Sequence, residues 1–220
     1  MKAKPLVVLL LILLCGCTQR ATNLTSSFRE AMFGFADIDK TEQEIVDLPY
    51  ACMYARVNNG QRIFLVLAFV DINPITGNKQ LKWLSADRAM ITTEHGRIVK
   101  TQSLPNTNLQ NIRYSEPQNN HLSNPLEKAT ATYDWQPDYQ YGHVGIIERH
   151  TVKQEEVNSV IWAKQATLVE EKIHFMDLSK SMSNLFWIDD HGHVVKSKQW
   201  LVPEQLYIEL EVLKPYSSGS

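Results

Sequence analysis

Two shortages in the composition narrow the chemistry of this chain. Only three cysteines occur in 220 residues, so a disulfide framework is not expected to hold the fold together. Basic residues number 22 against 24 acidic ones, and the formal net charge of −2 provides no positive field for nucleic-acid phosphates. Nucleic acid is therefore excluded as an expected partner. Glycine and proline are also scarce, at nine each, which allows long uninterrupted strands.

The rest of the composition is typical of a globular protein. Hydrophobic residues make up 44% of the chain and charged residues 21%, which is too apolar for a disordered polymer. A chain of this length buries roughly 70% of its unfolded surface, so folding needs no structural metal. We expect a single β-rich domain over residues 28–216, followed by a disordered tail at 217–220.

Residues 1–16 have the pattern of a signal peptide. Two lysines precede an unbroken apolar run over residues 6–14, which is shorter than the about 20 residues that span a bilayer. The run ends in Leu14-Cys15-Gly16-Cys17, which resembles the lipobox of bacterial lipoproteins and makes Cys17 the predicted lipid anchor. Two alternatives stay open, namely a soluble secreted protein and an inner-membrane anchor.

Acylation of Cys17 would hold the protein on a membrane permanently. Each buried methylene contributes about 0.8 kcal/mol, so several acyl chains, palmitate among them, anchor a protein firmly. Thr18 follows Cys17, and bacterial lipoproteins without aspartate there are usually sorted to the outer membrane. We therefore expect an outer-membrane lipoprotein that faces the periplasm, with residues 17–27 as anchor and polar tether. Cys52 is then the only cysteine in the folded part, and its apolar neighbours predict a buried thiol.

Beyond the tether the pattern changes from helical to β. Phe28, Met32 and Phe35 repeat at the spacing of a short amphipathic helix, and a second helical turn is expected over 41–46. From Tyr50 onward, β-branched and alternating apolar residues predict a mainly β fold with antiparallel sheets, as a meander, a sandwich or a barrel-like arrangement. The expected strands cover 51–57, 62–71, 80–85, 89–93, 97–101, 111–114, 129–135, 144–152, 159–163, 166–175, 185–189, 194–200 and 206–214.

Turn sequences support this interpretation. Asn58-Asn59-Gly60 separates the first two expected strands and is typical of a tight hairpin. The segment 95–101, His-Gly-Arg-Ile-Val-Lys-Thr, resembles 191–197, His-Gly-His-Val-Val-Lys-Ser, and in each a glycine turn leads into a strand. Two similar β modules within one domain would explain the recurrence, and chance repetition of a common hairpin is the alternative.

The sequence shows no motif for catalysis or for a cofactor. It contains no G-x-S-x-G elbow, Walker loop or dinucleotide-binding glycines, and the adjacent carboxylates Asp189-Asp190 would point to opposite faces of a strand. His191 and His193 could supply half of a metal site, but no further ligand motif accompanies them. We therefore predict no catalytic residues, no metal site and no cofactor.

Aromatic residues are the more suggestive feature. Trp135, Tyr139 and Tyr141 lie around Pro137, where a turn would expose them. Exposed rings stack on sugars or pack against partner proteins, so these three are the candidate contacts for a glycan or a partner. The alternative is that the rings fill the core and its rim.

Several sequence blocks resemble one lipoprotein family. The blocks are LPYACMY at 48–54, LKWLSAD at 81–87, HGRIVKT at 95–101, WID and GHVVKS within 187–197, and LKPY at 213–216. The chain is similar to the YjbF/GfcB-type lipoproteins of exopolysaccharide and group 4 capsule loci. That resemblance implies a largely β, lipid-anchored protein, encoded beside a porin-like outer-membrane partner. Two positions depart from the pattern, since Arg88 stands where a glycine is expected and Cys52 where a serine is expected.

The sequence and the resemblance together predict an outer-membrane lipoprotein that supports secretion or assembly of exopolysaccharide or capsule without catalysing a reaction. It would scaffold a porin-like barrel partner or contact the glycan. The alternative from another class is a periplasmic polysaccharide-modifying enzyme, which would need a cleft with two carboxylates of raised pKa. A purely structural envelope protein is a third interpretation.

Overall fold

The computed structural model describes residues 37–116, 121–122, 126–137 and 140–217, with only the backbone at 126 and 127. The helix expected over 28–35, the lipid-anchor residue Cys17 and the aromatic residue Tyr139 lie outside the described residues. None of the described helices is long and apolar enough to cross a membrane.

The first described element is the short helix α3, Glu42–Val46. Its N-terminus has a reciprocal cap, because the Thr41 hydroxyl accepts a hydrogen bond from the Glu44 N–H at 3.3 Å and the Glu44 carboxylate accepts one from the Thr41 N–H at 2.8 Å. Such a capping box satisfies N–H groups that a helix end leaves unpaired. The helical turn expected over 41–46 is thereby confirmed. Ile45 is buried and fixes the helix to the sheet face that points away from the main core.

The mainly β fold is confirmed, and the described chain contains twelve strands. They are β1 Cys52–Val57, β2 Arg62–Ile72, β3 Lys79–Ser85, β4 Met90–Glu94, β5 Arg97–Gln102, β6 Asn108–Tyr114, β7 Leu126–Gln136, β8 Gln140–Asn158, β9 Ala163–Phe175, β10 Lys180–Asp189, β11 Val194–Val202 and β12 Leu206–Lys214. The strand expected over 159–163 is wrong. The Ser159 N–H donates to the Trp162 carbonyl at 2.8 Å and closes the turn between β8 and β9. Ile161 favoured a strand there, but it instead packs against the cluster that holds α3.

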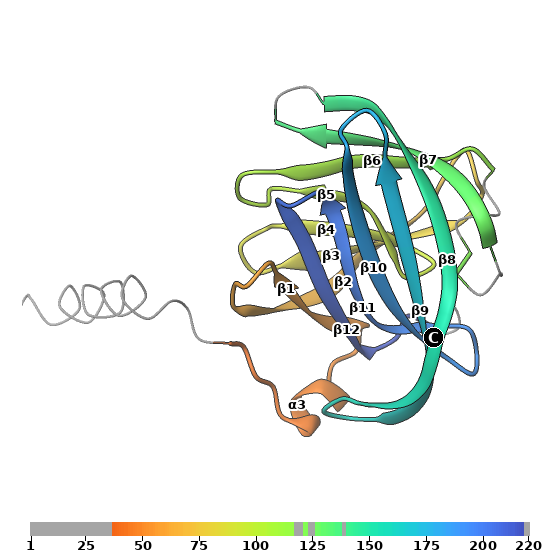
Figure 1. The fold of residues 1–220 in the computed structure, drawn as a ribbon. Coiled ribbons are helices and arrows are strands. Elements are labelled where there is room, and N and C mark those ends of the chain that lie inside the picture. Colours follow the sequence, from red (N-terminus) through yellow and green to blue (C-terminus); the bar gives the residue numbers. More distant parts are fainter. Residues whose placement is uncertain (1–36, 117–120, 123–125, 138–139, 218–220) are drawn as a thin grey trace, which may run out of the picture. The chain divides into compact units, whose positions relative to one another are not determined.

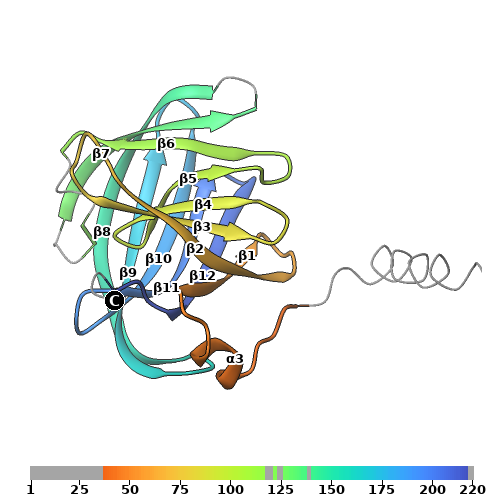
Figure 2. The same cartoon turned by 180° about the vertical axis from the view of Figure 1, so that it is seen from behind.

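All twelve strands of the described chain belong to one antiparallel sheet (Figures 1 and 2). The order is β5-β4-β3-β2-β1-β12-β11-β10-β9-β8-β7-β6, so most neighbours in the sheet are neighbours in sequence. The exception is the pairing of β1 with β12, which sets Met53 opposite Val212 and Val57 opposite Ile208. The sheet curls into a nearly closed barrel-like shape, and its two edge strands, β5 and β6, are consecutive in the chain.

The two recurring segments are hairpin turns of this one sheet rather than separate modules. Gly96 lies between β4 and β5 with φ 79°, and Gly192 lies between β10 and β11 with φ 80°. Glycine adopts this conformation without steric penalty, which explains its presence in both copies. The hairpin at Asn58-Asn59-Gly60 is confirmed between β1 and β2. Arg88, where the family pattern has glycine, also has a positive φ of 69°.

Side chains close the seam between the edge strands β5 and β6. The Thr101 hydroxyl accepts a hydrogen bond from the Leu109 N–H at 2.9 Å, which joins the two strands. Across the interior, Gln199 of β11 accepts a hydrogen bond from the Ile98 N–H at 2.9 Å and donates one to the Gly96 carbonyl at 3.0 Å. Unpaired backbone groups of an edge strand would otherwise be open to pairing with another chain. Side chains thus satisfy three backbone groups at the seam, where the sheet has no regular ladder.

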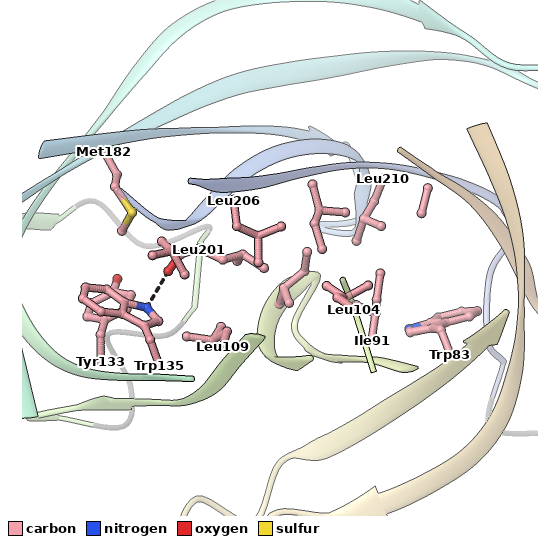
Figure 3. Packing of buried hydrophobic residues seen from close by; sticks show 14 of the residues in the cluster. Trp83, Ile91, Leu104, Leu109, Tyr133, Trp135, Met182, Leu201, Leu206 and Leu210 are labelled. Atoms are coloured by element: carbon pink, nitrogen blue, oxygen red, sulfur yellow. Dashed lines mark hydrogen bonds between the residues drawn. The ribbon is translucent and has the colours of Figure 1, made fainter. Parts of the chain in front are cut away.

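Large apolar side chains fill the interior, with Trp83 and Trp135 toward opposite ends of the cluster (Figure 3). Each indole is only 2% exposed. The Trp83 N–H donates to the Thr93 hydroxyl at 2.9 Å, and the Trp135 N–H donates to the Leu201 carbonyl at 2.6 Å. Because their polar edges are satisfied, both indoles can be buried without a hydrogen-bonding penalty. Cys52 is a buried free thiol, as expected.

A buried ionic cluster crosses the interior. The Glu171 carboxylate of β9 accepts two hydrogen bonds from Arg97 of β5, at 2.6 and 2.7 Å, and two from Arg149 of β8, at 2.6 and 2.8 Å. All three side chains are at most 2% exposed. Burial raises the pKa of Glu171, but the two guanidinium groups outweigh that effect and hold the pKa below its ordinary value. The carboxylate therefore stays charged inside the barrel.

Removing this charge should destabilise the fold strongly. Glu171→Gln leaves two buried guanidinium groups without their counter-ion, so we expect the free energy of unfolding to fall by about 3–5 kcal/mol in urea titrations. Glu170→Gln is the matched control, because the neighbouring side chain is 21% exposed and pairs with His150 at the surface. It should cost no more than about 1 kcal/mol. Equal losses in the two variants would contradict a structural role for the cluster.

The two turn glycines allow a second matched comparison. A Cβ atom at Gly96 would lie 2.4 Å from the Val194 Cβ atom, whereas one at Gly192 would meet nothing within 4 Å. Gly192→Ala should therefore lower the free energy of unfolding by about 1 kcal/mol, from backbone strain alone. Gly96→Ala should cost about 1–3 kcal/mol more because it also overpacks the contact. Adding Val194→Ala to Gly96→Ala should recover part of the loss, and a failure to recover any would contradict the steric explanation.

Candidate functional site

One end of the barrel contains a cavity of about 700 Å³. Its floor comes from the beginnings of β1 and β3 and the end of β12, and its rim from the turns after β4 and β10 and the connection between β6 and β7. This is the Trp83 end of the core in Figure 3. The ends of several strands and two hairpin turns converge there. The cavity therefore depends on how the sheet closes and not on any single sequence segment.

The floor of the cavity is apolar. It is formed by Met53, Leu81, Trp83, Leu210 and Val212. The Trp83 indole N–H and the Thr93 hydroxyl are hydrogen-bonded to each other, so the indole presents its apolar surface. Such a floor suits a hydrocarbon group better than a hydroxyl-rich one.

The rim of the cavity carries basic and aromatic side chains. His95, in the turn after β4, stacks on His121 with the ring centroids 3.9 Å apart. His193 lies in the turn after β10, and the Lys79 ammonium lies over the Tyr216 ring, 5.5 Å from its centroid. None of the described residues that line the cavity carries a carboxylate side chain. The rim therefore has a positive bias.

The His95–His121 stack shifts the titration of His95. Partial burial lowers the pKa of His95, the neighbouring His121 lowers it further, and Glu94 opposes both effects. Glu94 itself is buried and accepts hydrogen bonds from Asn73 and Asn78 of the β2–β3 turn. Its charge is thus engaged outside the cavity.

The two recurring sequence segments meet at this rim. His95-Gly96 and Gly192-His193 both line the cavity, and Gly96 contacts Val194 directly. The sequence indicates the recurrence but not the cavity, because nothing in a local pattern shows that two turns so far apart in the chain face each other. The repeated His-Gly pair was the one available signal.

The predicted aromatic contacts do not form this site. Trp135 is buried at the other end of the core and stacks on His143, so it lacks the exposed face that a glycan or partner contact requires, and this part of the prediction is wrong. Tyr141 is 50% exposed and stays a candidate contact. Tyr139 lies outside the described residues, so its assignment stays a prediction.

The described residues include no group of three or more histidine, cysteine, aspartate or glutamate side chains placed to bind a metal ion. His191 and His193 have their ring centroids 6.4 Å apart, and the side chain of each is 73% exposed. Asp189, next to them in the turn, is instead hydrogen-bonded to Lys164 and to the turn backbone. The hydrogen bonds of Asp189 therefore stabilise the turn between β10 and β11.

The fold and the cavity define a class of nearly closed antiparallel barrels with an apolar pocket at one end. Within that class, the chain belongs to the family described as group 4 capsule polysaccharide lipoprotein GfcB, YjbF, whose model matches residues 25–213. The resemblance seen in the sequence blocks is thus confirmed, and the chain is a lipoprotein of a capsule-related family.

Two curated relatives and one solved structure support this assignment. The chain is 31% identical to the uncharacterized lipoprotein GfcB of Escherichia coli (strain K12), over 96% of this chain and 99% of that protein. It is 28% identical to the uncharacterized lipoprotein YjbF of the same strain, over 96% and 97%. A crystal structure of the hypothetical lipoprotein YmcC from Escherichia coli (K12) matches with a TM-score of 0.70 at 31% identity, covering 87% of this chain and 95% of that one.

The histidine stack predicts a pH dependence of stability. Because the pKa of folded His95 lies below the ordinary value of 6.5, the unfolded chain binds more protons than the folded chain just below that pH. The free energy of unfolding should therefore fall as the pH is lowered through about 6.5. His95→Asn, which tolerates the positive φ of 50°, should flatten this dependence in urea titrations. His191→Asn, in the matching turn, should keep it, and an unchanged slope in His95→Asn would contradict the assignment.

Proposed function

We propose that the protein is an outer-membrane lipoprotein that supports the secretion or assembly of an exopolysaccharide or capsule, and that it acts by binding rather than by catalysis. The observation that carries this proposal is the family match over residues 25–213, combined with the lipobox that ends at Cys17. Membership of a lipoprotein family supports an envelope location. Thr18 after the anchor supports sorting to the outer membrane, with the body on the periplasmic face.

The acyl anchor would supply the functional advantage. Confining a protein to a membrane surface raises its effective concentration for anything else in that membrane, without any new contact. A porin-like barrel that conducts the polymer is the partner that we propose, and the emerging glycan is a second binding candidate. Tyr141 is the exposed ring that could serve such a contact, while the cavity offers a separate site.

The role of the anchor can be tested by complementation. Deleting the gene should abolish surface polysaccharide while precursor synthesis continues, and the wild-type chain should restore the polymer. Cys17→Ser should appear in the soluble periplasmic fraction and should fail to restore it, because the acylated thiol is lost. Cys15→Ser is the matched control, since it alters the same segment without removing the predicted anchor. Both fractions and surface polymer are read by immunoblotting.

Two outcomes would contradict the proposal. If Cys17→Ser still co-fractionates with outer membranes, the anchor assignment fails. If the purified protein shortens or chemically modifies the polymer, the binding role is replaced by an enzymatic one.

A further inference from the structure

We propose that the cavity binds a single amphipathic lipid anion, with its hydrocarbon chain on the apolar floor and its acidic headgroup at the rim. This site is distinct from the covalent lipid at Cys17, and the inference stands whether or not the protein takes part in polysaccharide secretion.

The apolar floor continues onto the lip of the barrel. Val70 pairs with Leu81, and Ile72 pairs with Lys79, in the ladder between β2 and β3. Directly opposed residues of an antiparallel pair point to the same face, so Val70 and Ile72 extend the face that Leu81 presents to the cavity. They are 38% and 58% exposed, which is unusual for adjacent large apolar side chains on one face. The floor and lip together form a continuous apolar track that leads outward.

The dimensions of the cavity suit a single chain. Its volume of about 700 Å³ falls within the roughly 300–1,000 Å³ range of small-molecule sites. A hydrocarbon chain can fill it without leaving a polar group unpaired, because the Trp83 N–H and the Thr93 hydroxyl already satisfy each other. A sugar would bring hydroxyl groups for which this floor has no hydrogen-bonding partners. The floor therefore favours a lipid over a glycan.

The charge of the rim selects an acidic headgroup. The Lys79 ammonium lies over Tyr216 at the outer end of the apolar track, and among the described residues it forms no ion pair. His95 and His121 lie on the same rim and can donate hydrogen bonds from their ring nitrogens. Two buried carboxylates adjoin the rim turns, and both are engaged elsewhere: Glu94 accepts hydrogen bonds from Asn73 and Asn78, and Asp189 accepts one from Lys164. A carboxylate or phosphate headgroup thus meets donors and a cation, and it meets no carboxylate among the described residues that line the cavity.

The ammonium of Lys196 is a useful contrast. Lys196 borders the cavity through its place in β11, but its ammonium lies over the Trp187 ring, 5.5 Å from the centroid. Trp187 packs in a separate cluster from the core that forms the cavity floor. Lys79 is therefore the lysine expected to contact the headgroup.

Photo-crosslinking to the full acylated chain tests this site. The probe is tetradecanoic acid with a diazirine at the end of its chain, added to the protein in phosphatidylethanolamine vesicles and mapped by peptide mass spectrometry. We expect adducts concentrated in the segments 79–83 and 208–214, which hold four of the five floor residues. Dodecanoic acid should compete at several-fold lower concentration than its methyl ester, because the ester lacks the charge.

Matched lysine variants separate the site from general partitioning into the bilayer. Lys79→Gln should reduce crosslinking several-fold. Lys82→Gln should leave it unchanged, because that side chain lies on the opposite face of β3 and pairs with Asp71. Both lysines are at the surface, so neither substitution is expected to unfold the protein.

A floor variant provides an independent readout. Val212→Phe adds volume to the floor and should reduce adducts there, with folding checked by near-ultraviolet circular dichroism. Adducts spread evenly over exposed apolar residues, or equal crosslinking in Lys79→Gln and Lys82→Gln, would overturn the proposal. So would adducts confined to the N-terminal segment 17–36. A loss of surface polysaccharide in the gene deletion bears on the proposed function only, so the two tests can fail separately.

Discussion

A single buried carboxylate links β9 to the edge strand β5, with which β9 forms no ladder. Glu171 of β9 binds guanidinium groups from β5 and from its sheet neighbour β8, so one edge strand is linked through the interior to two strands near the other edge of the sheet. Arg97 also lies over the rings of Phe186 and Tyr114, at 5.0 and 5.2 Å from their centroids, which places its charge among apolar neighbours. Two buried positive charges are tolerable there only while the carboxylate is present.

The contact between Arg97 and Glu171 also bears on how the seam of the sheet closes. With Arg97 held, the residues on either side of it lie where Gln199 satisfies the Ile98 N–H and the Gly96 carbonyl. The β4–β5 turn is then carried against Val194 of the β10–β11 turn, and this contact forms part of the cavity rim. The ionic cluster, the sealed seam and the pocket are thus one connected arrangement. We regard the pocket as a consequence of how the sheet closes.

Local patterns in the sequence predicted local structure well. The helical turn with its Thr41 cap, the Asn58-Asn59-Gly60 hairpin and the buried Cys52 all depend on interactions between near neighbours, and the structure has them. The resemblance predicts a glycine at position 88, and Arg88 adopts there the positive φ that glycine accommodates readily. These features are determined by a few adjacent residues and can be predicted without knowing the fold.

Features that depend on distant parts of the chain could not be predicted in this way. The alternation within β7 shows that Trp135 shares a face with Tyr133, but only the closed sheet makes that face the interior. Ile161 has strong β propensity, yet its packing beside α3 places it in a turn. The cavity needed β1 to pair with β12, and nothing in either segment alone indicates that partner. The aromatic prediction therefore named Trp135 and missed the rim histidines.

The position of β1 has a mechanical consequence under the proposed anchoring through Cys17. Although it is first in sequence, β1 lies between β2 and β12, so ladders hold it on both sides. Asp37, where the described body begins, is tied to Arg56 and to the Arg62 backbone. Tension from the anchor would thus act first on the ion pair between Asp37 and Arg56. It would act next on β1, which can detach only if its ladders with β2 and β12 break together. The edge strands β5 and β6, each with a ladder on one side only, come from the middle of the chain, so this tension does not act on them directly.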